Sequence, residues 1–85
     1  MFEGSGKLDI KELLSLEYLN LSHNKLINVF GISKILSLKE LVISFNSIND
    51  LSPLSICENL EKLNFKNNSV TSIKCLSGLK EMKFD

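Results

Sequence analysis

A 22-residue spacing of apolar residues and asparagines runs through most of this 85-residue chain. Three segments, which begin at Leu16, Leu38 and Leu60, follow the pattern LxxLxLxxNxL, with an aliphatic residue or phenylalanine at every apolar position. A repeat of this length predicts units that cannot bury their apolar side alone but share a continuous core when they stack. The spacing therefore predicts an elongated stack of coils and argues against an ordinary layered domain.

Each segment also predicts a short strand. Apolar residues two positions apart, such as Leu19 and Leu21, point to one face of a strand, and the residues between them point to the other. We expect parallel strands near residues 18–22, 40–44 and 62–66, with a fourth near 81–84. The fourth is out of step, because Leu79 follows Leu60 by 19 residues instead of 22.

The repeated asparagines stand where each strand ends. An asparagine at such a turn can bond the backbone groups that the turn leaves unpaired, in its own coil and in the next. We interpret them as a buried structural ladder, formed by Asn24, Asn46 and Asn68.

The segments between strands predict short helices on the other side of each coil. Ser52 would be the N-cap of a helix that extends to Glu58, with Pro53 at its first position. Residues 30–37 predict a second helical or 3₁₀ turn.

The whole pattern closely resembles the 22-residue class of the leucine-rich repeat superfamily, over about residues 10 to 84. Members of that class include a regulatory subunit of protein phosphatase one, an axonemal dynein light chain, a spliceosomal A-prime protein and bacterial internalins. The resemblance implies an α/β solenoid, with three to four short parallel strands on the concave face and short helical or 3₁₀ segments on the convex face. It also implies that the concave face binds another macromolecule.

The domain organisation follows from the repeats. Residues 1–9 are expected to be a flexible or partial segment, and residues 10–85 are expected to form the repeats. Ile10 and Leu13 lie 22 residues before Ile32 and Ile35, as the convex half of a preceding coil would. Neither end has the polar cap that solenoids need, so we expect a fragment of a longer array or a subunit whose ends are covered by neighbours.

The concave positions are the candidate binding residues. Val42 and Phe45 are apolar where the other repeats carry mostly polar residues, and Tyr18 is one strand away, as in an interface rich in aromatic anchors. Glu40, Lys62 and Glu81 alternate in sign along one column, so we expect neighbours to attract. The full candidate set is Tyr18, Asn20, His23, Glu40, Val42, Phe45, Lys62, Asn64 and Lys66.

Composition argues against several functions. Ten lysines balance ten acidic residues and there is no arginine, so direct nucleic-acid binding is not expected. His23 is the only histidine, and it has neither the companions of a metal site nor those of a catalytic base, so we expect no metal, no cofactor and no enzyme activity. The longest apolar run, residues 41–43, is far too short for a membrane span.

The cysteines bear on the cellular setting. Cys57 and Cys75 fit no zinc or CxxC spacing, and we interpret them as reduced thiols of an intracellular protein, cytoplasmic or nuclear. The leading hypothesis is a regulatory or scaffolding module that binds another protein through its concave sheet. One alternative is a structural subunit of a ribonucleoprotein. Another is an internalin-like surface adhesion repeat, since residues 49–54 resemble internalin repeats.

Overall fold

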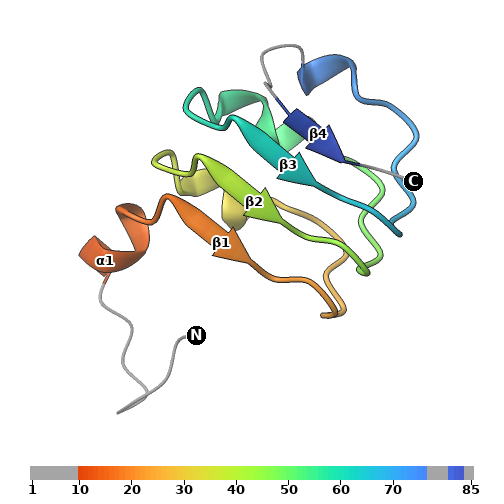
Figure 1. Ribbon diagram of the computed structural model, residues 1–85, viewed down its shortest axis with the longest axis horizontal. Coiled ribbons are helices and arrows are strands. Elements are labelled where there is room, and N and C mark those ends of the chain that lie inside the picture. The colour runs from red at the N-terminus through yellow and green to blue at the C-terminus, as the bar shows by residue number, and fades with distance from the viewer. Residues whose placement is uncertain (1–9, 77–80, 84–85) are drawn as a thin grey trace.

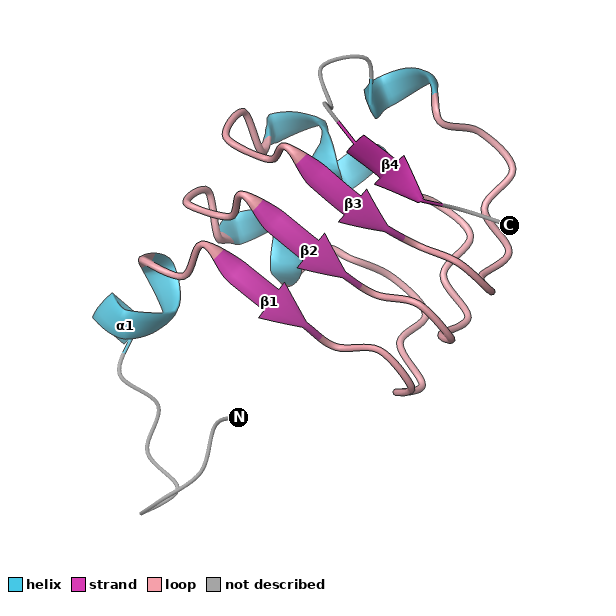
Figure 2. Ribbon diagram, viewed as in Figure 1, coloured by secondary structure: helices cyan, strands magenta, loops and turns pink. Residues whose placement is uncertain are grey.

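The computed structural model describes residues 10–76 and 81–83, and these form a curved stack of coils (Figure 1). One parallel sheet contains the four strands in sequence order. The strands are β1 (Tyr18–Asn20), β2 (Glu40–Val42), β3 (Lys62–Asn64) and β4 (Glu81–Lys83). The other elements are α1 (Ile10–Leu14) and the 3₁₀ helices η1 (Ile32–Lys34), η2 (Ser52–Ile56) and η3 (Lys74–Leu76). Figure 2 shows the 3₁₀ helices on the side of the coils opposite the strands. The predicted solenoid with parallel strands is confirmed.

The strand register follows the 22-residue spacing. Leu41 lies between Leu19 and Leu63 on the neighbouring strands, and the central residue of β1, β2 and β3 is buried while its flanking residues are more exposed. Each strand starts where the sequence predicts, but it is three residues long. Hydrogen bonds nevertheless continue beyond the strands, for example from the N–H of His23 to the carbonyl of Ser44 at 3.0 Å.

The shortened last repeat does not prevent pairing. Met82 of β4 lies opposite Leu63 of β3, in the position that Leu41 has relative to Leu19. The chain between β3 and β4 is therefore shorter by about one helical turn without a shift in strand register.

The second coil contains most of the fully buried core. Leu38, Leu41, Ile43, Ile48 and Leu51 are all fully buried. At three of the five matching positions of the first coil, Leu16, Leu21 and Leu26 are only partly buried against the same core. A coil between two others buries both of its sides, so packing is most complete in the middle of the stack.

The 3₁₀ helix η2 differs from the helix predicted from the sequence. It is a 3₁₀ helix that ends at Ile56, and its N-cap residue is Leu51, so the prediction of Ser52 as N-cap was wrong. The carboxylate of Asp50 accepts the N–H of Ser52 at 2.9 Å. Asp50, one residue before the N-cap Leu51, thus provides the side-chain acceptor at the start of the helix. Because Ser52 is already inside the helix, its own side chain caps nothing.

The ladder asparagines bond backward along the stack. Asn46 Nδ2 donates to the carbonyls of Ile43 and Ser44 in its own coil and to that of Leu21 in the preceding coil, and its Oδ1 accepts the N–H of Leu26. Asn68 repeats this pattern on the second coil, as it donates to Ile43 and accepts the N–H of Ile48. The expected bonds to the next coil therefore run to the preceding coil.

Asn24 differs from the other two ladder asparagines. It is exposed rather than buried, and its side-chain amide donates to the carbonyls of Leu21 and Ser22 in its own coil. Among the described residues no strand precedes β1, so nothing covers this asparagine.

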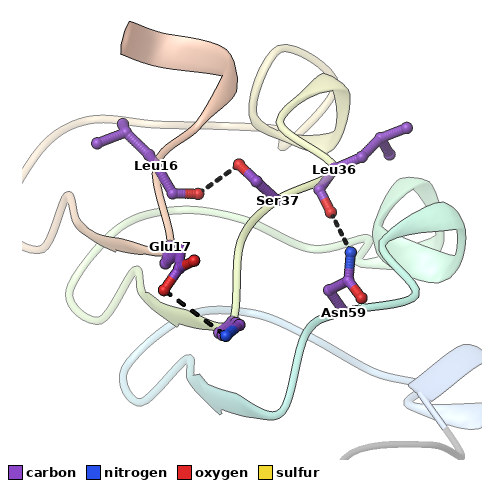
Figure 3. A network of polar contacts seen from close by, with 6 residues as sticks. Leu16, Glu17, Leu36, Ser37 and Asn59 are labelled. Atoms are coloured by element: carbon purple, nitrogen blue, oxygen red, sulfur yellow. Dashed lines mark hydrogen bonds and ion pairs between the residues drawn. The ribbon is translucent and has the colours of Figure 1, made fainter.

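A second set of polar bonds joins the coils at the opposite end of the strands (Figure 3). Ser37 Oγ donates to the carbonyls of Leu14 and Leu16, and Asn59 Nδ2 donates to that of Leu36 at 3.0 Å. Ser37 and Asn59 are also 22 residues apart. Each coil is thus tied to the preceding one at both ends of its strand.

Candidate functional site

The strands place the predicted concave residues in two straight columns. Tyr18, Glu40 and Lys62 lie side by side in the first column, and β4 adds Glu81 as the fourth backbone position. The second column contains Asn20, Val42 and Asn64, and is extended by the backbone of Lys83. Neighbouring members of a column are separated by the strand spacing of about 4.8 Å.

Exposure differs among these residues. Tyr18 and Phe45 are about half exposed, at 54% and 48%. Val42 is half-buried between two asparagines on the neighbouring strands. Of the other candidates, Glu40 and Asn64 are half-buried, while Asn20, His23, Lys62 and Lys66 are exposed.

The most unusual geometry lies just after the strands. His23, Phe45 and Asn67 occupy equivalent positions and all have left-handed backbones, with φ of 58°, 57° and 58°. This conformation is uncommon outside glycine and asparagine, and it is an outlier for a bulky residue. The rings of His23 and Phe45 stack at 4.4 Å between centroids and 10° between planes. These two turns thus bring the rings of His23 and Phe45 face to face on the open side of the coils.

Glu40 and Lys62 do not form the attraction predicted for the first column, and the side chain of Glu81, the third member, lies outside the described residues. Among the described residues, Glu40 and Lys62 make no ion pair. Lys39 instead reaches Glu17 at 3.7 Å, one residue before the column (Figure 3). Solvent-exposed pairs of this kind gain little, since water screens the charges and ordering long side chains costs entropy. Among the described side chains, Glu40 has no ion-pair partner and therefore remains available to a partner protein.

Two of the candidate asparagines are engaged by their own strands. Asn20 Oδ1 accepts both the N–H and the hydroxyl of Ser22, at 3.0 and 2.6 Å. Asn64 Oδ1 accepts the N–H of Lys66 at 3.2 Å. These bonds fix the direction in which the chain leaves the strand, which is a structural role beside any contact with a partner.

The interior of the described part of the chain contains a cysteine thiol. Cys57 is a buried free thiol whose Sγ donates to the carbonyl of Ser33 at 3.5 Å, and burial raises the pKa of this thiol above its ordinary value. A buried neutral thiol is a poor nucleophile, because the thiolate is the reactive form. The side chain of Cys75 lies outside the described residues.

Groups suited to catalysis or metal binding are not gathered in the described part of the chain. Residues 10–76 and 81–83 contain no cluster of three histidine, cysteine, aspartate or glutamate side chains that could hold a metal. A shallow pocket beside the third turn is lined by no ionisable side chain, its walls being Phe65, Asn67, Asn68, Val70, Thr71, Ser72 and Ile73. None of the described helices is long and apolar enough to cross a membrane.

Sequence reasoning missed two features of this surface. The left-handed position before each ladder asparagine is one, since Asn67 and His23 are of residue types enriched in that conformation but Phe45 gives no such signal. The bonds of Ser37 and Asn59 could have been found, since polar residues recur there with the 22-residue step.

Comparisons with known proteins agree with the coils described above. The family model "Leucine Rich Repeat" matches residues 15–35 and 37–58, just over half of the chain. The chain therefore belongs to the leucine-rich repeat family, whose repeats form protein-interaction modules.

A solved structure, that of internalin C2 from Listeria monocytogenes, matches with a TM-score of 0.78 and 25% sequence identity. The match covers 82% of this chain and 32% of the internalin C2 chain, so this chain spans about a third of that relative's length. No curated protein matched the sequence.

Proposed function

We propose that this chain is a regulatory or scaffolding module that binds a partner protein through its concave sheet, with Phe45 at the centre of the contact. The observation that carries the proposal is the half-exposed phenylalanine in a left-handed backbone, stacked on His23. A bulky residue in this conformation costs stability, and such strain is concentrated at functional sites. Aromatic anchors also contribute most of the energy in many interfaces.

The remaining concave residues fit a contact that surrounds this anchor. Tyr18 and Val42 extend the apolar surface over two strands, and Glu40 and Lys62, which form no ion pair with each other, offer charges of both signs beside it. Interfaces typically combine an apolar centre with a polar rim. An intracellular setting remains part of the proposal, supported by the free thiol of Cys57.

The experiment is an affinity capture from a cell extract with three forms of the chain. Phe45→Asn removes the ring yet suits the left-handed backbone, as Asn67 does in the third coil. Phe30→Asn is the matched control, because Phe30 is 63% exposed but lies beside η1 on the convex side. We expect one set of proteins to bind the unmodified chain and Phe30→Asn but not Phe45→Asn. Equal capture by all three would contradict a concave interface.

A second candidate function is a surface adhesion repeat, and the likeness to internalin C2 favours it. The capture experiment separates the two, since an adhesion repeat would bind a protein exposed on another cell's surface rather than proteins of the extract. The ribonucleoprotein alternative stays a hypothesis and has no observation of its own among the described residues.

A further inference from the structure

We infer that the concave face takes an extended segment of its partner in which a large apolar side chain stands next to an aspartate or glutamate. This inference rests on the proposed function and adds the chemistry of the ligand. Its site is the aromatic–lysine platform, defined as His23, Phe45 and Lys66.

The first argument is the position of Lys66 beside the stacked rings. The N–H of Phe45 donates to the carbonyl of Lys66 at 2.9 Å, so the two residues are neighbours on adjacent coils. Lys66 is exposed and has no ion-pair partner among the described residues. An ammonium group is therefore within reach of any ligand that packs on Phe45.

The second argument is the distribution of charge between the two ends of the strands. The turns after the strands, residues 21–27, 43–49 and 65–71, contain two lysines, Lys25 and Lys66, and no aspartate or glutamate. The starts of β1, β2 and β3 instead carry charges of both signs, with glutamates Glu17, Glu40 and Glu61 beside the lysines Lys39 and Lys62. The end of the sheet that holds the rings thus attracts an anion more than the other end does.

The third argument is the set of polar groups that accompany the platform. A carboxylate near Lys66 would meet a neutral surface of serine and asparagine side chains, and it would face no repulsive charge from those turns. Two lysines and a near-neutral chain are too few positive charges for a nucleic-acid backbone, which is bound mainly through many phosphate contacts. Charge complementarity therefore favours an acidic peptide over RNA.

The test uses three labelled probes with the full chain: a peptide pool with a fixed leucine or phenylalanine flanked by glutamate, the same pool with lysine in place of glutamate, and a polyuridine oligonucleotide. Affinity is measured by fluorescence anisotropy for the unmodified chain, Phe45→Asn, Lys66→Glu and Lys34→Glu. Lys34 is the matched control, since it is an exposed lysine of η1 on the convex side.

We expect the acidic pool to bind best, and Lys66→Glu to weaken that binding about fivefold to tenfold, as for reversal of a charge at an interface rim. Lys34→Glu should bind like the unmodified chain, and added salt should weaken the acidic pool selectively. Preference for the basic pool or for polyuridine, equal binding of both pools, or equal loss in the two lysine variants would overturn the inference.

The variants also separate this inference from the proposed function. If Phe45→Asn abolishes peptide binding while Lys66→Glu leaves it unchanged, the concave interface stands and the acidic ligand is refuted. If Phe45→Asn leaves binding of the acidic pool unchanged, both are refuted. If neither peptide pool binds, the peptide inference fails, and the capture experiment alone decides the proposed function.

Discussion

At the scale of single residues, the position before each ladder asparagine combines strain with exposure. Asn67 suits a left-handed backbone, because its short polar side chain can bond locally, whereas Phe45 does not. The stack with His23 offsets part of the cost, since an aromatic pair contributes about 0.5–1.5 kcal/mol beyond its buried area. Contacts with neighbouring residues, rather than the intrinsic backbone preference of phenylalanine, thus hold Phe45 in the left-handed conformation.

Replacing Phe45 tests this strain. Phe45→Asn and Phe45→Ala both lose the stack, but asparagine tolerates φ of 57° better than alanine does. We expect Phe45→Asn to be the more stable of the two by about 0.5–1 kcal/mol, as measured by urea unfolding. An alanine variant as stable as the asparagine variant would contradict a left-handed backbone at this position.

The ladder gives a second prediction at the residue scale. Asn46→Ala leaves the partly buried N–H of Leu26 without its side-chain acceptor and removes one of two amide donors to the carbonyl of Leu21, whereas Asn24→Ala removes only bonds within an exposed turn. We expect Asn46→Ala to cost about 2–4 kcal/mol and Asn24→Ala less than about 1 kcal/mol. Thermal and urea unfolding of the two variants measure the difference, and equal costs would refute the role of bonds between coils.

The framework could be predicted from the sequence because it repeats. Leu19, Leu41 and Leu63 occupy one register position, and three occurrences of one pattern fix the strand face without any knowledge of tertiary contacts. The direction of the ladder bonds could not be predicted in this way, because a period is the same read forward or backward. The site was harder still, since the stack of His23 on Phe45 depends on a backbone angle that phenylalanine does not favour.

At the scale of elements, the convex segments vary while the strands do not. η1, η2 and η3 are 3₁₀ helices of three to five residues, and 3₁₀ helices are commonly short connectors of this kind. The sequence predicted the helix at Pro53, but the predicted N-cap, Ser52, lies one residue after the observed N-cap, Leu51. Serine and aspartate are both good caps, and only the observed turn shows that Asp50 provides the acceptor.

Asp50 makes the stability of this element depend on pH. The N–H and then the hydroxyl of Ser52 lower the pKa of the Asp50 carboxyl, so the charged form is favoured in the folded state. Its contribution is present above the unfolded pKa of about 3.9 and is lost as pH falls through the lower folded pKa. We therefore expect acidification below about pH 4 to lower the Tm of the unmodified chain more than that of Asp50→Asn.

Calorimetry at a series of pH values checks this expectation. Glu58→Gln is the control, since it removes another exposed negative charge just after η2. Parallel Tm curves for the unmodified chain and Asp50→Asn would show that the bond to Ser52 does not form in solution.

At the scale of the whole molecule, coils contact mainly their neighbours, so stability is distributed along a line. The second coil packs against coils on both sides and contributes the largest fully buried set, including Leu41 and Ile48. The first coil shows Leu21 and Leu26 only partly buried. The aromatic–lysine platform joins coils one, two and three, since His23, Phe45 and Lys66 come from successive turns. A partner that binds there would therefore also hold the coils together.

Truncation of equivalent residues measures this distribution. Leu26 and Ile48 are 22 residues apart, and the N–H of each is accepted by the asparagine of the following coil. Because Ile48 is fully buried and Leu26 only partly so, we expect Ile48→Ala to cost about 3–4 kcal/mol and Leu26→Ala about 1–2 kcal/mol. A domain of this size has total stability of about 4–13 kcal/mol, so the first variant should unfold at much lower urea. Equal losses of stability in the two variants would instead show that the coils contribute equally to the free energy of unfolding.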